Sequence, residues 1–65
     1  MDIFSKEMTK YEIDLISEMN INDIEGIVDN ALMSIMSQES VVIGMKNLDI
    51  IMETIKRKED NEHIG

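Results

Sequence analysis

The segment of residues 40–55 is the most apolar part of the 65-residue chain and constrains its fold more than any other segment. Its apolar residues recur every three or four positions, which places five of them on one face of an α-helix: Val41, Met45, Leu48, Met52 and Ile55. Ile51 widens this face. Because a helix with so wide an apolar surface must be covered in water, we expect the rest of the chain, or a second copy of it, to pack against it.

Two further amphipathic helices are predicted before this segment. The first is expected over residues 3–19, where apolar residues recur at helical spacing: Phe4, Met8, Tyr11 and Leu15. Thr9 and Glu12 also match a capping box, and in that alternative the helix begins only at Lys10. The second helix is expected over residues 23–37, with Asn22 as its N-cap. Gly26, in its first turn, is expected to allow the close approach of another backbone.

The polar residues 37–40 separate the second helix from the third, because the apolar seams on their two sides are out of phase by three residues. A turn explains this slip, and so does one continuous helix over residues 23–58 with a local irregularity. We favour the turn. The third helix is then expected over residues 40–58, and the polar residues 59–65 are expected to fray. The predicted fold is all-α, a hairpin or bundle of two or three helices that forms a single domain over residues 1–58.

A chain of this length without cysteine has few ways to stabilise a fold. Below roughly 70–80 residues one hydrophobic core rarely supplies more than about 3–5 kcal/mol. Disulfides cannot add to this, and the sequence has no cluster of cysteine and histidine that would hold a structural metal. We therefore expect homo-oligomerisation, with a dimer favoured, to complete the helical core.

The net charge of the chain is −8 at pH 7, from 14 acidic and six basic residues. A surface this acidic repels phosphate backbones, so direct binding to nucleic acid is not expected. The apolar runs are far shorter than the roughly 20 residues that a membrane-spanning helix needs. Since no secretory signal is visible either, we expect a cytoplasmic protein without a membrane span.

The sequence offers little of the chemistry that catalysis requires. The one histidine, His63, lies in the polar tail, and the five serines have no companion base in any recognisable motif. There is no glycine-rich phosphate-binding loop, and the acidic pairs at helical spacing are typical of a solvated helix face. We therefore expect a protein that is not an enzyme and that uses neither a cofactor nor a metal.

The wide apolar face and the seven methionines favour a role in protein–protein interaction, because methionine lines adaptable binding grooves. We expect a small acidic regulator, adaptor or inhibitor that binds another protein through a Met-rich helix face. The predicted contact residues for a partner or a second copy are Met36, Val41, Met45, Leu48, Ile51, Met52 and Ile55.

Two alternatives from other classes remain open. The first is a structural subunit of a larger helical assembly, built by open-ended contacts between copies. The second is an acidic mimic of nucleic acid that inhibits a DNA- or RNA-binding protein. In the mimic, phosphates would be replaced by the carboxylates of Glu7, Glu12, Asp14, Glu18, Glu25 and Asp29.

Overall fold

The structure, a computed structural model, describes residues 2–64, with the side chains of His63 and Ile64 excepted. Within these residues it contains three α-helices and no strand. The helices are α1 (Lys10–Glu18), α2 (Ile21–Ser34) and α3 (Val42–Ile64), and the short 3₁₀-helix η1 (Ile35–Ser37) follows α2 directly. The predicted all-α class is confirmed.

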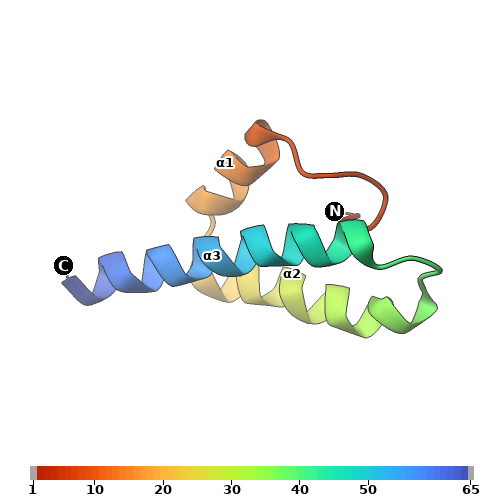
Figure 1. Ribbon diagram of the computed structural model, residues 1–65. Coiled ribbons are helices and arrows are strands. Elements are labelled where there is room, and N and C mark those ends of the chain that lie inside the picture. The colour runs from red at the N-terminus through yellow and green to blue at the C-terminus, as the bar shows by residue number, and fades with distance from the viewer. Residues whose placement is uncertain (1, 65) are drawn as a thin grey trace.

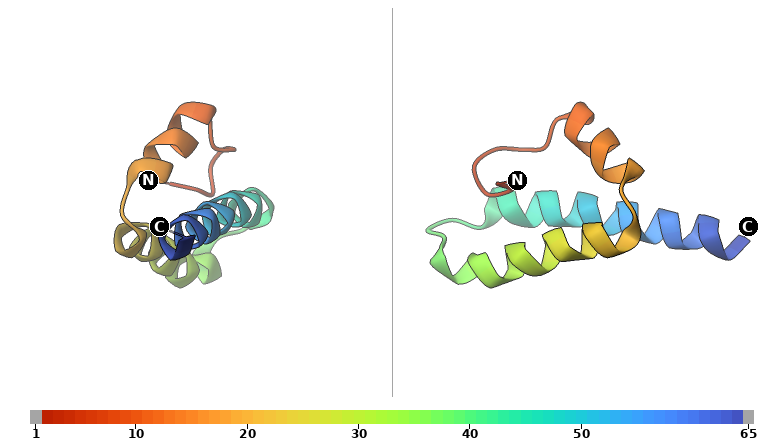
Figure 2. Two further views of the ribbon diagram at one scale, coloured as in Figure 1. Left: turned by 90° about the vertical axis from the view of Figure 1, so that its left-hand side faces the viewer. Right: turned by 180° about the vertical axis from the view of Figure 1, so that it is seen from behind.

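Helices α2 and α3 lie side by side and antiparallel, joined at one end by the loop after η1 (Figure 1). We call residues 2–9, which precede α1 and are not helical, the N-terminal arm. The arm and α1 lie on the same side of the α2–α3 pair, as both views in Figure 2 show. The chain thus covers the pair from one side.

The first helix begins at Lys10, so the prediction of a helix over residues 3–19 is wrong and the capping-box alternative is right. The Thr9 hydroxyl accepts a hydrogen bond from the Glu12 N–H at 3.2 Å, and the Glu12 carboxylate accepts one from the Thr9 N–H at 3.0 Å. Hydrogen bonds from Thr9 lower the pKa of the Glu12 carboxyl, and the bond from the Thr9 N–H has a larger effect than the bond from the Thr9 hydroxyl. The two residues therefore satisfy each other's backbone N–H groups and fix the start of the helix.

The breaks between the helices lie where the sequence predicts them, with small shifts. Helix α2 begins at Ile21, two residues before its predicted start, because Asn20 serves as the N-cap and accepts from the Asp23 N–H at 2.9 Å. The non-helical residues 38–41 separate η1 from α3, which confirms the turn over one continuous helix.

Helix α3 continues to Ile64, beyond its predicted end at residue 58. Neither glycine nor proline interrupts residues 45–64, and most of residues 56–62 are strong helix formers. The Lys58 ammonium donates to the Ser17 carbonyl at 2.8 Å, near the C-terminus of α1, where a cation is favourable. Fraying of residues 59–65 stays a prediction, and Gly65 lies outside the described residues.

The hydrophobic core lies where the arm and the three helices meet. Every one of these four segments contributes at least one buried apolar side chain, and the set is Ile3, Ile16, Ile24, Ala31, Leu48 and Ile51. The arm is thus part of the core although it is not helical.

Asn47 on α3 is fully buried and holds the arm in place. Its Nδ2 donates to the carbonyl oxygens of Ile3 at 2.6 Å and Lys6 at 2.9 Å, and its Oδ1 accepts from the Met8 N–H at 3.0 Å. Because the arm has no secondary structure of its own, one side chain supplies the partners that its backbone needs on burial.

Gly44 lies one turn before Asn47 and provides the space for the arm's aromatic side chain. The Phe4 ring rests so close to the Gly44 backbone that a Cβ atom at this position would overlap it. Gly26, by contrast, has no atom within 4 Å of the position that a Cβ would take. The close approach of another backbone predicted at Gly26 is therefore wrong, and Gly44 instead permits the close approach of the Phe4 ring.

Replacing Asn47 tests its role as the clamp of the arm. Asn47→Ala leaves three backbone groups of the arm without partners, and we expect the free energy of unfolding to fall by about 2–3 kcal/mol. The measurement is urea denaturation followed by circular dichroism, together with faster hydrogen exchange at the Met8 amide. The control is Asn61→Ala, at an exposed position of the same helix. Equal stability of the two variants would contradict this role.

The two helical glycines form a matched pair for a second prediction. Gly26→Ala should raise the free energy of unfolding by about 0.5–1 kcal/mol, because alanine favours the helix and meets nothing there. Gly44→Ala should lower it by about 1–2 kcal/mol, because the new methyl group displaces Phe4. In a Phe4→Ala background, Gly44→Ala should instead raise the free energy of unfolding. If both alanines stabilise the unaltered protein alike, Phe4 does not occupy this position.

Candidate functional site

The seven predicted contact residues do not form one surface. Leu48 is 4% exposed and Ile51 is fully buried, so both pack inside the single chain. We therefore reassign these two residues from partner contacts to the core. The helical spacing of α3 could not separate them from their neighbours, since all of them lie within one wide apolar face.

The other five predicted residues differ in exposure. Met45 and Met52 are exposed on α3, whereas Ile55 and Val41 are half-buried. Met36 is 93% exposed in η1, near the loop that joins α2 to α3. Met45 and Met52 are seven residues apart and so share one face of α3.

A groove runs between α2 and α3 beside Met52. Val28 of α2 and Met52 and Ile55 of α3 form its apolar lining, and its volume is about 390 Å³. A second hollow lies on the outer side of Met52, against Asp49, Glu53 and Lys56. The Met52 side chain therefore separates two hollows, and an approaching partner can contact it from both sides.

Leu32 and Met45 continue the same faces toward the loop. Leu32 follows Val28 by four residues on α2, and Met45 precedes Met52 by seven on α3. Because the two helices are antiparallel (Figure 1), both steps lead in the same direction along the pair. We call the surface formed by Val28, Leu32, Met45, Met52 and Ile55 the docking face.

The docking face lies on a different side of each helix from the arm. On α3 the arm packs against Gly44 and Asn47, whereas Met45 and Met52 form the docking face. On α2 the arm faces Ile27 and Ala31, whereas Glu25, Val28 and Asp29 line the groove. The arm and α1 therefore leave the docking face uncovered.

Four carboxylates border the two hollows. Glu25 and Asp29 line the groove from α2, and Asp49 and Glu53 line the outer hollow on α3. Lys56 is the one cation among the residues that line either hollow. Within residues 2–62, whose side chains are described, one ion pair is formed, between Lys46 and Glu7 at 3.5 Å. None of the four carboxylates takes part in it, so they remain free for solvent or a partner.

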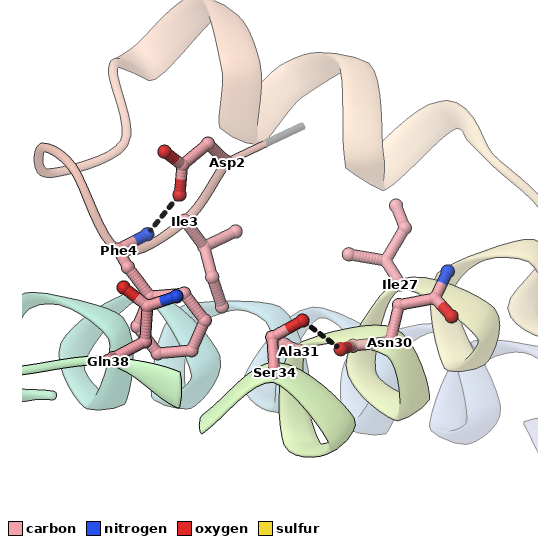
Figure 3. A pocket seen from close by; sticks show the side chains of 8 residues that line it. All are labelled: Asp2, Ile3, Phe4, Ile27, Asn30, Ala31, Ser34 and Gln38. Atoms are coloured by element: carbon pink, nitrogen blue, oxygen red, sulfur yellow. Dashed lines mark hydrogen bonds between the residues drawn. The ribbon is translucent and has the colours of Figure 1, made fainter. Parts of the chain in front are cut away.

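A separate cavity of about 350 Å³ lies between the arm and α2 (Figure 3). The carboxylate of Asp2, which lines the cavity, accepts a hydrogen bond from the Phe4 N–H at 2.9 Å. Hydrogen bonds from the Ser5 hydroxyl, which has the larger effect, and from the Phe4 N–H lower the pKa of this carboxyl. Ser34 donates to the Asn30 carbonyl at 3.0 Å. The hydroxyl in the lining, that of Ser34, is therefore bonded to a backbone carbonyl and not to a companion base.

The described part of the chain shows no arrangement typical of a metal site. It has no group of three or more histidine, aspartate or glutamate side chains placed to hold a metal ion. None of its helices is both long enough and apolar enough to cross a bilayer. The docking face is therefore the strongest candidate site.

Of the predicted contact residues, Met45, Met52 and Ile55 lie on the α3 side of the docking face, and none lies on its α2 side. Val28 and Leu32 belong to the apolar seam of the second helix, but they were not among the predicted contacts. Asn47 and Gly44, which position the arm, were also missed. A small residue and a polar residue three positions apart on the most apolar helix were the sequence signal for this role.

Comparison with known proteins gives no match to a protein-family model, to a curated protein or to a solved structure.

Proposed function

We propose that this chain is a small, non-enzymatic, cytoplasmic interaction module that binds another protein through the docking face. The observation that carries this proposal is the exposure of three large apolar side chains there: Leu32 is 52% exposed, Met45 47% and Met52 56%. Their exposure is not a consequence of a missing core, since six apolar residues are buried beside them. Several exposed large apolar side chains beside an apolar groove with a charged border are typical of an interaction site.

Methionine suits this role for a physical reason. Its side chain is unbranched and polarisable, so it adapts to the shape of the surface that covers it. Met45 and Met52 give the docking face such contacts on the α3 side, and Leu32 adds a stiffer contact on the α2 side. We propose that the face recognises an apolar seam and that its borders provide the selectivity.

The other sequence-based expectations stay predictions. Homo-oligomerisation and a structural subunit would both place a second copy on an apolar surface of this kind. The nucleic-acid mimic has less support, because two of its six carboxylates already have partners within the chain. Glu7 pairs with Lys46, and Glu12 closes the capping box of α1.

Site-specific photocrosslinking in the native cell tests the proposed function. A benzophenone amino acid replaces Met52 in one variant and Met45 in another, and we expect each to give a discrete crosslinked product. The control replaces Tyr11, which is 70% exposed on α1, and it should give none. The mass of the product distinguishes a foreign protein from a second copy. Equal crosslinking from all three positions, or none from the docking face, would overturn the proposal.

A further inference from the structure

We propose that the docking face takes a cationic amphipathic helix of another protein, whose basic side chains flank an apolar seam. The inference rests on the proposed function and adds the chemical class of the partner. It comes from the placement of charge around the face rather than from its apolar content.

The carboxylates lie on both sides of Met52, at one end of the face. Glu25 and Asp29 lie along the α2 side of Met52, and Asp49 and Glu53 lie along its outer side on α3. Lys56 offsets one of these four charges, which leaves three net negative charges around one methionine. A helix seated over Met52 therefore faces acidic groups on both flanks, and Lys or Arg at these positions would complement them.

The shape of the face also suits a helix. From Met45 to Ile55 the face follows ten residues of α3, which at a rise of 1.5 Å per residue is about 15 Å, or nearly three helical turns. The apolar groups lie along two neighbouring antiparallel helices, α2 and α3, so that a partner helix needs apolar residues at intervals of three, four and seven. An added strand is not supported, since residues 2–64 contain no strand to extend.

The same charges disfavour a second copy as the occupant. A symmetric dimer through this face would bring four carboxylates of one copy near four of the other, with one Lys56 from each. The dimer would also double the net charge of −8 in one particle. The dimer expected from the sequence rested on the size of the core, and the position of the acidic groups now favours a basic partner over it.

Three synthetic peptides of about four helical turns test the inference with the full-length chain. They share one leucine seam at helical spacing and carry lysine, glutamine or glutamate on the flanks. We expect the lysine peptide to bind about tenfold more tightly than the glutamine peptide at low salt, and the glutamate peptide to bind least. Most of this advantage should disappear in 0.5 M salt, since the carboxylates are exposed. Calorimetry measures the affinities.

Methyl NMR of the methionines locates the bound peptide. The signals of Met45 and Met52 should shift on addition of the lysine peptide, and that of Met8, a residue of the arm, should not. A matched pair of charge variants separates this site from general attraction to an acidic protein. Asp29→Asn with Asp49→Asn should weaken binding about fivefold, whereas Asp14→Asn with Glu18→Gln, on α1, should leave it unchanged.

Four results would overturn the inference. An equal loss of affinity for the lysine peptide in the two double variants would mean that the peptide is attracted unspecifically by the acidic protein. Equal binding of the lysine and glutamine peptides would remove the role of charge but leave the docking face intact. Self-association that covers Met45 and Met52 would make a second copy the occupant. Failure of all three peptides to bind would reject the helix as the occupant, and the crosslinks from Met52 would still decide the proposed function separately.

Discussion

The side chain of Asn47 is the constraint on which the rest of the structure depends. Its three hydrogen bonds join α3 to residues that lie 39 to 44 positions earlier in the chain. Asn47 is fully buried, and its bond to the Ile3 carbonyl is buried as well, whereas its bonds to the Lys6 carbonyl and the Met8 N–H are partly buried. These bonds replace water at backbone groups of the arm. Gly44 adds the space for Phe4, so the arm is fixed both by hydrogen bonds and by shape.

The fixed arm decides which part of the α3 surface is covered. The arm occupies one side of the helix around Gly44 and Asn47. Leu48 and Ile51 are buried in the core that the arm and the three helices share. Met45 and Met52 remain exposed, because the arm and α1 lie on one side of the helix pair (Figure 2). The docking face is thus a consequence of how 65 residues are distributed around one wide apolar helix. Its carboxylates are the basis of the proposed preference for a cationic partner.

Local patterns in the sequence predicted the helices well where local forces determine them. The apolar spacing in residues 40–55 predicted α3, the phase slip predicted the turn after η1, and Thr9 with Glu12 offered the correct start of α1. The preferred start near residue 3 failed because Phe4 and Met8 have helical spacing with α1, yet they belong to the arm. Their partners on α3 lie some 40 residues away, beyond the reach of any local pattern.

The exposure of the predicted contact residues could be foreseen only in part, for the same physical reason. Leu48 and Met52 are one turn apart on one apolar face, and nothing in their spacing tells which of them α2 will bury. The outcome, a buried Leu48 and an exposed Met52, depends on the position of α2 and the arm. The positions of the carboxylates around Met52 likewise became visible only once two separate helices were brought together.

The central claim is that the chain covers α3 from one side and leaves Met45 and Met52 open. Methionine oxidation by dilute hydrogen peroxide, followed by peptide mass spectrometry, tests it most directly. The account predicts that Met45 and Met52, like the 93% exposed Met36, are oxidised early, and that the half-buried Met8 and Met19 are oxidised late. Protection of Met45 and Met52 to the same degree as Met8, persisting at low protein concentration, would show that the chain covers this face itself and would contradict the account.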